Sequence, residues 1–177
     1  CMTSENHQSG TDRIYEALNF FDQNQLIEKV INLQGDLPTI DQFALKEVLN
    51  LLDSAEVDIG TLVAPFKDFD EMQKAQYVKA ECYFKSNNIK ARANNFTRIA
   101  NKEKMENLYH HVGIYSYRRE ALEKFVKLKQ TNREKEEKLE QLRAIENNMH
   151  IEVSLINSPI LGIDTQEDLD NIREIQK

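Results

Sequence analysis

Cysteine, proline and glycine are scarce in this sequence, and tryptophan is absent. The 177 residues include 2 cysteines, 3 prolines and 5 glycines. Cys1 and Cys82 lie far apart and form no CxxC motif, so neither a disulfide framework nor a zinc site is expected. No repeat, linker or low-complexity stretch interrupts the chain, and a single domain over residues 1–177 is the simplest organisation.

Positive charge and long apolar runs are scarce as well. Lys and Arg number 23 against 30 Asp and Glu, which gives a net charge of −7. This balance argues against a nucleic-acid partner, because binding a phosphate backbone needs clustered Lys and Arg. It still allows a small nucleotide that arrives with a metal ion.

No apolar run approaches the roughly 18 residues of a membrane span, and no signal peptide is visible, so we expect a cytoplasmic protein without a membrane partner.

Short apolar runs alternate with helical patterns along the chain, which is typical of an α/β fold. Apolar spacing predicts helices over residues 11–21, 41–52, 68–75, 119–126 and 133–147, and a last helix after residue 165. Strands are predicted over residues 26–33, 57–64, 77–85, 89–96, 109–117 and 151–156. Ser9 or Thr11 could cap the first helix, and Thr131 or Asn132 the helix over residues 133–147.

Two aspartates stand at positions suited to a metal ion. Asp36 follows an apolar strand and Gly35, so we expect it at the carboxyl end of a sheet strand, where open α/β sheets bind ligands. Its carboxylate could hold Mg²⁺, or Asp36 could only form a turn with its neighbours. Asp164 precedes the last helix, and from the residues alone it could serve only to stabilise that helix N-terminus.

Three further segments carry candidate binding residues. The polar loop from His7 to Arg13 enters a helix and could donate hydrogen bonds to a nucleotide, although an ordinary capped helix start explains it equally well. His111 and Tyr115 share one face of a strand by period two, and the alternative is an aromatic face that packs in the core. Glu140 and Gln141 lie on the charged helix, which could be only a surface or partner-packing helix.

Five segments together resemble one enzyme family. They are His7-Gln8-Ser9-Gly10-Thr11-Asp12-Arg13, Asn32-Leu33-Gln34-Gly35-Asp36-Leu37-Pro38, His111-Val112-Gly113-Ile114-Tyr115-Ser116-Tyr117-Arg118, Glu140-Gln141-Leu142-Arg143 and Gly162-Ile163-Asp164-Thr165-Gln166-Glu167-Asp168-Leu169. In this order and spacing they are similar to 3-deoxy-manno-octulosonate cytidylyltransferase, the CMP-Kdo synthetase of lipopolysaccharide assembly. The resemblance runs from Cys1 to Lys177.

The resemblance implies both a fold and a reaction. The fold would be a Rossmann-like nucleotidyltransferase, a three-layer α/β/α sandwich with a mixed sheet. The reaction would transfer CMP from CTP to the eight-carbon sugar acid 3-deoxy-manno-octulosonate (Kdo) and release pyrophosphate, in a cytoplasmic homodimer. Asp36 and Asp164 would hold Mg²⁺ as the catalytic, metal-binding pair.

The resemblance also assigns binding residues. Gln8, Ser9, Gly10, Arg13 and Gln34 would contact the nucleotide, and Arg98, His111, Tyr115, Glu140 and Gln141 would contact the sugar. The Arg98 segment departs from the family pattern. Asn95 stands where a tyrosine is usual, and a proline expected soon after Arg98 is absent from residues 99–101.

Members of this family begin with a strand and a basic loop that grips the triphosphate, and no such loop precedes His7. We therefore expect the sequence to start within the fold and to expose apolar sheet surface. Two other hypotheses stay open. The chain could be a non-catalytic remnant or assembly module of the family, or a cytidylyltransferase for a related acidic sugar such as 8-amino-Kdo.

Overall fold

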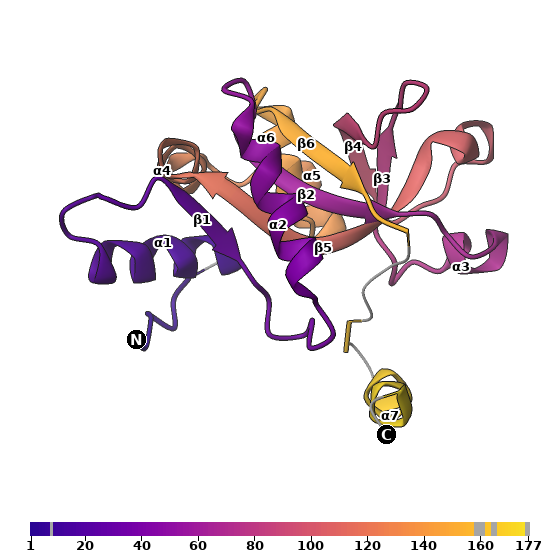
Figure 1. The fold of residues 1–177 in the computed structure, drawn as a ribbon, viewed down its shortest axis with the longest axis horizontal. Coiled ribbons are helices and arrows are strands. Elements are labelled where there is room, and N and C mark those ends of the chain that lie inside the picture. The colour runs from indigo at the N-terminus through magenta and orange to yellow at the C-terminus, as the bar shows by residue number, and fades with distance from the viewer. Residues whose placement is uncertain (8, 158–161, 164–165, 176–177) are drawn as a thin grey trace.

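A single mixed sheet organises the molecule (Figure 1). The computed structural model describes residues 1–177 apart from 8, 158–161, 164–165 and 176–177. The described strands are β1 (Lys29–Asn32), β2 (Ile59–Ala64), β3 (Lys79–Cys82), β4 (Lys90–Thr97), β5 (Leu108–Arg118) and β6 (Ile151–Leu155). They lie in the order β1-β5-β2-β6-β4-β3, and β2 and β6 are the parallel pair.

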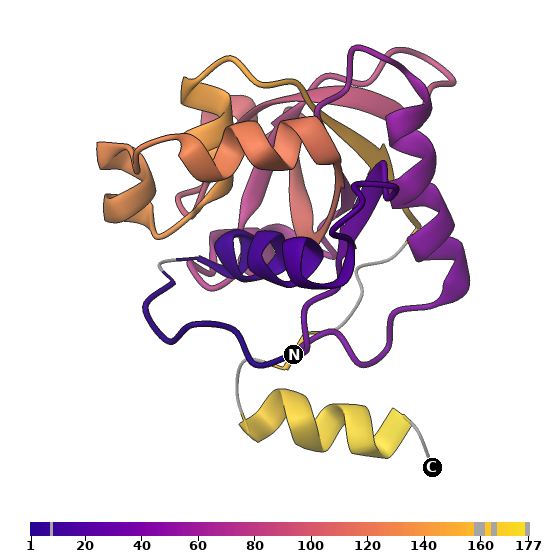
Figure 2. The same cartoon turned by 90° about the vertical axis from the view of Figure 1, so that its left-hand side faces the viewer.

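Helices cover both faces of this sheet. The described helices are α1 (Gly10–Phe21), α2 (Gln42–Asn50), α3 (Phe69–Gln73), α4 (Arg119–Lys127), α5 (Asn132–Glu137), α6 (Gln141–Glu146) and α7 (Gln166–Ile175), with short 3₁₀ helices η1 (Leu51–Asp53) and η2 (Lys102–Asn107). Helix α2 lies on one face, and α1, α4, α5 and α6 lie on the other (Figure 2). This arrangement confirms the predicted three-layer α/β/α architecture. No helix within the described parts of the chain is long and apolar enough to cross a membrane.

Each face of the sheet has its own apolar core. On one side Leu122 and Phe125 of α4 pack with Leu142 of α6 against the strands. On the other side Val48 of α2 packs against the strands in a second cluster. Gly60 on β2 lets α2 approach closely, since a β-carbon there would lie 2.8 Å from the Val48 carbonyl oxygen.

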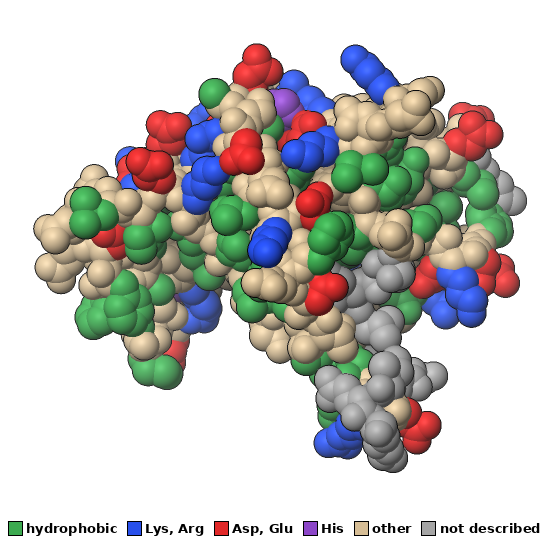
Figure 3. Space-filling model, in the orientation of Figure 1, with side chains coloured by type: hydrophobic (Ala, Val, Ile, Leu, Met, Phe, Trp, Pro, Cys, Tyr) green, Lys and Arg blue, Asp and Glu red, His purple; other side chains and the backbone are tan. Residues whose placement is uncertain are grey.

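Strand β5 is the longest described strand, and it joins two parts of the sheet. Its C-terminal part pairs with β1, residues 110–117 pair with β2, and its first three residues pair with β3. Through β6 and β4 the pairings return to β3, so β1 is the one described strand with a single partner. Large hydrophobic side chains are exposed at the end of α1 (Phe20 and Phe21), on either side of β1 (Leu26, Ile27 and Leu33) and at the start of α2 (Phe43). Exposed hydrophobic side chains are visible in green on the face shown in Figure 3.

Several predicted elements need correction. The strand predicted over residues 26–33 begins only at Lys29, because the Asp22 carboxylate accepts the backbone N–H groups of Leu26 and Ile27 at 3.0 and 2.8 Å. The strand predicted over residues 77–85 is reduced to β3. The long helix predicted over residues 133–147 is two helices, α5 and α6, separated at Lys138, which has a positive φ of 54°.

Side-chain caps begin α1, α2, α3 and α5, as the residue types predict. Ser9 caps α1 and accepts the Asp12 N–H, which decides between Ser9 and Thr11. Thr131 caps α5 in a full capping box with Glu134, which decides between Thr131 and Asn132.

Candidate functional site

One pocket gathers six of the twelve residues that the sequence singled out. It has a volume of about 390 Å³ and lies where β1, β5 and the α5–α6 junction meet. We refer to it as the Glu140 pocket. Its lining residues are Gly10, Asn32, Gln34, Val78, His111, Gly113, Tyr115, Lys138, Leu139, Glu140 and Gln141. Segments that lie far apart in the sequence therefore meet at one site.

The wall of the pocket on β5 depends on an irregularity in the sheet. Thr61 of β2 pairs with Tyr115, but the next residue of β2, Leu62, pairs with Val112. Gly113 therefore lies in a bulge, and bulges re-aim side chains near functional sites. His111 and Tyr115 flank this bulge, their ring centroids are 5.4 Å apart, and both are buried.

Hydrogen bonding determines which ring nitrogen of His111 carries the proton. The Thr61 hydroxyl has one proton, which it donates to the Ile114 carbonyl at 2.7 Å. It therefore accepts from Nε2–H of His111 at 3.0 Å, and Nδ1 of the ring carries no proton. Burial lowers the pKa of His111 to about 3. Burial likewise raises the pKa of Tyr115 well above its ordinary value, so both rings are neutral at physiological pH.

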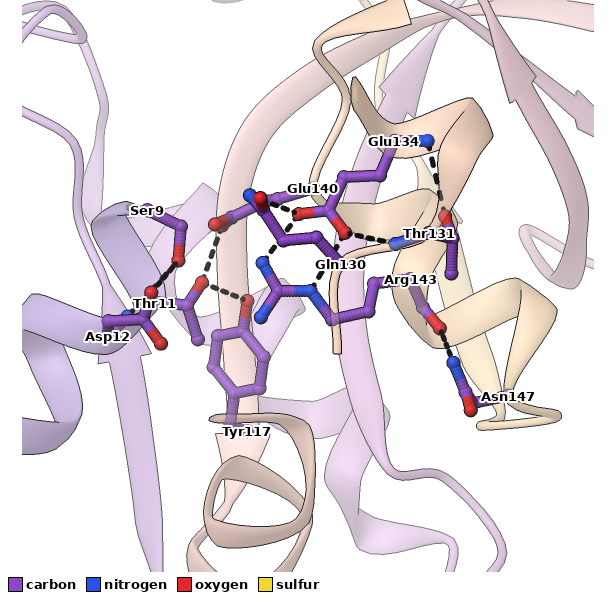
Figure 4. A network of polar contacts seen from close by, with 10 residues as sticks. All are labelled: Ser9, Thr11, Asp12, Tyr117, Gln130, Thr131, Glu134, Glu140, Arg143 and Asn147. Carbon is purple, nitrogen blue, oxygen red and sulfur yellow. Dashed lines mark hydrogen bonds and ion pairs between the residues drawn. The ribbon is translucent and has the colours of Figure 1, made fainter. Parts of the chain in front are cut away.

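A chain of two hydroxyl groups orients the Glu140 side chain (Figure 4). The Thr11 hydroxyl donates to Oε1 of Glu140 at 2.5 Å, and the Tyr117 hydroxyl lies 3.3 Å from the same Thr11 oxygen. Since Thr11 has only one proton to give, Tyr117 is the donor in the second contact. This agrees with the burial of Tyr117, which raises its pKa and keeps it protonated.

A buried ion pair holds the α5–α6 junction in place (Figure 4). Arg143 donates to both carboxylate oxygens of Glu134 at 2.9 and 2.5 Å, and the two side chains are 3% and 4% exposed. Its guanidinium also lies 4.6 Å above the ring centroid of Phe125. Since Glu134 and Arg143 lie on different sides of the break at Lys138, their pairing folds the chain back and brings Glu140 to the pocket.

The remaining predicted residues lie elsewhere. Ser9 lines an adjoining cavity of about 420 Å³ together with Lys138 and Glu140. Arg13 donates to the Thr3 hydroxyl at 3.1 Å and to the Ser4 carbonyl at 2.9 Å, and it does not line the Glu140 pocket. Gln8 lies outside the described residues.

Arg98 is also absent from the lining of the Glu140 pocket. Its guanidinium donates to the carbonyl of Glu137 at 2.9 Å and to the carbonyl of Ala75 at 3.2 Å. Its own carbonyl accepts from the buried Lys79 ammonium at 2.9 Å. In this structure Arg98 joins the end of β4 to α5 and to the loop before β3, and a sugar contact stays a prediction.

Asp36 is the described member of the predicted metal pair. Its Oδ1 atom is buried and has no hydrogen-bond partner among the described residues. Its backbone carbonyl accepts the N–H of Ile163 at 2.9 Å, which brings the Gly162–Ile163 segment beside it. Asp164 lies outside the described residues. Within the described part of the chain, no cluster of three or more acidic, His or Cys side chains could hold a metal.

Two polar lining residues, Asn32 and Lys138, were not among the candidates. Asn32 is a polar residue at the end of an apolar strand, and it is only 5% exposed. A polar residue at the end of an apolar strand indicates a candidate binding residue, so the sequence alone could have identified Asn32. Lys138 is placed by its left-handed backbone at the break between α5 and α6, which no local pattern indicated.

Outside the pocket, His110 stacks on Phe66 at 5.3 Å between centroids.

Comparisons with known proteins agree with this arrangement. A family model described as Cytidylyltransferase matches residues 1–151. The chain is 47% identical over 174 residues to the 3-deoxy-manno-octulosonate cytidylyltransferase of Bartonella bacilliformis, covering 98% of this chain and 71% of that protein. Its identity to the protein of the same name from Bartonella quintana is 48% over the same shares.

A solved structure is similar over nearly the whole chain. It is a CMP:2-keto-3-deoxy-manno-octonic acid synthetase complexed with CTP, with a TM-score of 0.83 and 28% identity, covering 99% of this chain and 71% of that chain. The mixed sheet, its helical layers and the polar pocket define a nucleotidyltransferase of the nucleotide-diphospho-sugar transferase fold. Together with the sequence matches, this narrows the class further. The chain belongs to the 3-deoxy-manno-octulosonate cytidylyltransferase family.

Proposed function

We propose that this chain activates Kdo with CTP, giving CMP-Kdo and pyrophosphate. The observation that carries the proposal is the Glu140 pocket, where four of the five residues matched to the family's sugar contacts, His111, Tyr115, Glu140 and Gln141, lie together. Its neutral rings and polar side chains suit a polyhydroxylated ligand. The similar solved structure is a complex with CTP, which supports CTP as the second substrate.

The reaction needs positioning more than a reactive side chain. The anomeric hydroxyl of Kdo attacks the α-phosphorus of CTP, the bond to the β-phosphate oxygen breaks, pyrophosphate leaves and the hydroxyl proton passes to solvent. Holding both substrates in line supplies much of the rate enhancement, because it replaces an encounter of two molecules with a reaction inside one complex. Gly10, Gln34 and the β5 residues are the groups that would hold the substrates.

We propose Asp36 and Asp164 as the residues that hold Mg²⁺. The unpartnered, buried Oδ1 of Asp36 fits this role, because carboxylate oxygens are preferred Mg²⁺ ligands and a buried oxygen without a partner is costly. The hydrogen bond from Ile163 to Asp36 supports the pairing, since Asp164 follows Ile163 directly in the sequence. When bound, Mg²⁺ would neutralise phosphate charge.

Pyrophosphate release tests the proposal. The folded chain is mixed with CTP, Mg²⁺ and Kdo, and release is expected only when Kdo is present. Asp36→Asn is expected to lower kcat by roughly 10²–10³-fold, as loss of transition-state charge stabilisation does. Asp70→Asn is the matched control, because Asp70 is exposed in the first turn of α3 and should leave kcat unchanged.

Each part of the proposal has its own contrary result. Folded protein that releases no pyrophosphate with Kdo would overturn the reaction, and normal turnover in Asp36→Asn would overturn the metal role alone. Equal turnover with 8-amino-Kdo would remove the preference for Kdo. Family membership also supports, as proposals, a place in lipopolysaccharide assembly, a cytoplasmic location and a homodimer; sedimentation equilibrium would test the dimer.

A further inference from the structure

Two buried polar atoms in the Glu140 pocket have no hydrogen-bond partner among the described residues. They are Nδ2 of Asn32, which is a donor, and Oε2 of Glu140, which is an acceptor. Buried polar groups in folded proteins are almost always paired, so each exception calls for an explanation. A pair of opposite kind in one pocket points to a missing group that can both accept and donate.

Asn32 is held firmly by its strand. It is the last residue of β1 and pairs with Tyr115 of β5, which also lines the pocket. Gly10 lies beside the amide, and a β-carbon there would stand 3.9 Å from Nδ2. Nδ2 is therefore packed against the start of α1, with only a glycine between them.

Glu140 is oriented just as firmly. The Thr11 hydroxyl occupies Oε1, and Thr11 in turn receives the Tyr117 proton. Arg143, the nearby buried cation, donates hydrogen bonds from Nε and Nη2 to Glu134. Oε2 of Glu140 is therefore left as a carboxylate oxygen with free acceptor capacity.

The chemistry of the two atoms selects the ligand group. A hydroxyl accepts from an amide N–H and donates to a carboxylate, so one hydroxyl or a neighbouring pair of hydroxyls satisfies both atoms. A carboxylate or phosphate would be repelled by Glu140. Lys138 is the only Lys or Arg among the lining residues, and it would draw the acidic end of a ligand toward its own side of the pocket.

We propose that Asn32 and Glu140 form a donor–acceptor pair that binds a sugar hydroxyl and so fixes the orientation of the acidic sugar. Asn32 thereby becomes a specificity-determining residue of this site. The inference rests on the proposed function for the identity of the sugar, Kdo. The two unsatisfied atoms, and the pocket that both residues line, come from the structure alone.

Calorimetric titration of the folded chain with Kdo tests the inference. Asn32→Asp keeps the shape of the side chain but removes the donor, and Kdo affinity is expected to fall at least tenfold. Asn24→Asp is the control, because it makes the same chemical change at an exposed position outside the pocket and should leave affinity unchanged. Glu140→Gln should also weaken binding, since an amide cannot offer both acceptor oxygens.

The ligand provides a second, independent measurement. Kdo derivatives that each lack one hydroxyl are titrated against the wild-type chain and Asn32→Asp. One derivative should bind the wild type at least tenfold more weakly than Kdo, yet bind both proteins alike. If Asn32→Asp fails to fold, the wild-type series decides, and changes below twofold for every derivative would overturn the inference.

The outcomes separate the two proposals. If the wild type binds Kdo and Asn32→Asp binds it with the same affinity, the donor–acceptor pair is overturned and the proposed function is not. Folded wild-type protein that does not bind Kdo at all overturns both.

Discussion

The buried ion pair between Glu134 and Arg143 allows a sharp prediction about stability. Arg143→Met removes the charge but keeps an unbranched apolar side chain over Phe125. Glu134 then stays buried with hydrogen bonds from the Thr131 N–H at 3.2 Å and the Gln130 side-chain amide at 3.3 Å, and with no cationic partner. We expect the folded state to be strongly destabilised, because an uncompensated buried charge is left behind.

The geometry gives the magnitude. Two unit charges about 3 Å apart attract by roughly 5–6 kcal/mol at an effective dielectric constant of about 20. Part of this attraction is offset by the cost of burying both ions, and breaking one side of a buried pair typically costs about 3–5 kcal/mol. A natural domain has only about 5–15 kcal/mol of stability, so the variant should lose a large share of it. Neutralising the remaining partner with Glu134→Gln should recover about 2 kcal/mol or more.

Urea unfolding followed by circular dichroism measures these differences. Arg133→Met is the matched control: Arg133 lies on α5, its side chain is 40% exposed, and it contacts Glu137 at 3.3 Å and the Asn95 side-chain oxygen at 2.9 Å. An exposed pair of this kind contributes about 0–1 kcal/mol, so the control should change little. Equal losses in Arg143→Met and Arg133→Met, or no recovery in the double variant, would refute the reasoning.

Two further predictions follow from buried positions. His111 has a folded-state pKa of about 3 against an ordinary value of 6.5, so the folded protein loses stability as pH falls below about 6.5 and the loss levels off near 3. Relative to His111→Gln, the wild type should lose about 2–3 kcal/mol between pH 7 and pH 4.5 in urea unfolding, and parallel pH profiles would contradict this. Gly60→Ala places a β-carbon 2.5 Å from the Ser116 hydroxyl and should cost about 1–3 kcal/mol by the same measurement. Gly35→Ala, with nothing within 4 Å, is its control, and equal free energies of unfolding for the two variants would show that the sheet shifts to accommodate the methyl group at position 60.

Much of the fold was predictable because it depends on local rules. Period-two and helical spacing of apolar residues located most strands and helices, and Ser9 and Thr131 are caps because their hydroxyls accept helix N–H groups. The helix and strand boundaries that were predicted wrongly depend on contacts between residues distant in sequence, or on side chains that compete for backbone hydrogen bonds. Asp22 shortens β1 by taking N–H groups that a strand would otherwise use.

The candidate site shows the same division. The resemblance singled out His111, Tyr115, Glu140 and Gln141, and these residues do line one pocket. It also singled out Arg98, whose donors are directed at backbone carbonyls of neighbouring segments. Residue types indicate which side chains can bind a ligand, but competing partners inside the fold decide which side chains are free to do so.

The sequence by itself determined the fold class, the family and most of the pocket residues, because apolar periodicity and short motifs are local properties of the chain. Tertiary structure decided the helix break at Lys138, which follows from the burial of Glu134 with Arg143. It also decided that Asn32 and Glu140 share one pocket, because that depends on β1 pairing with β5 and on Thr11 reaching Glu140. These contacts join residues far apart in the sequence, and a local pattern carries no information about which distant partner will be buried beside it.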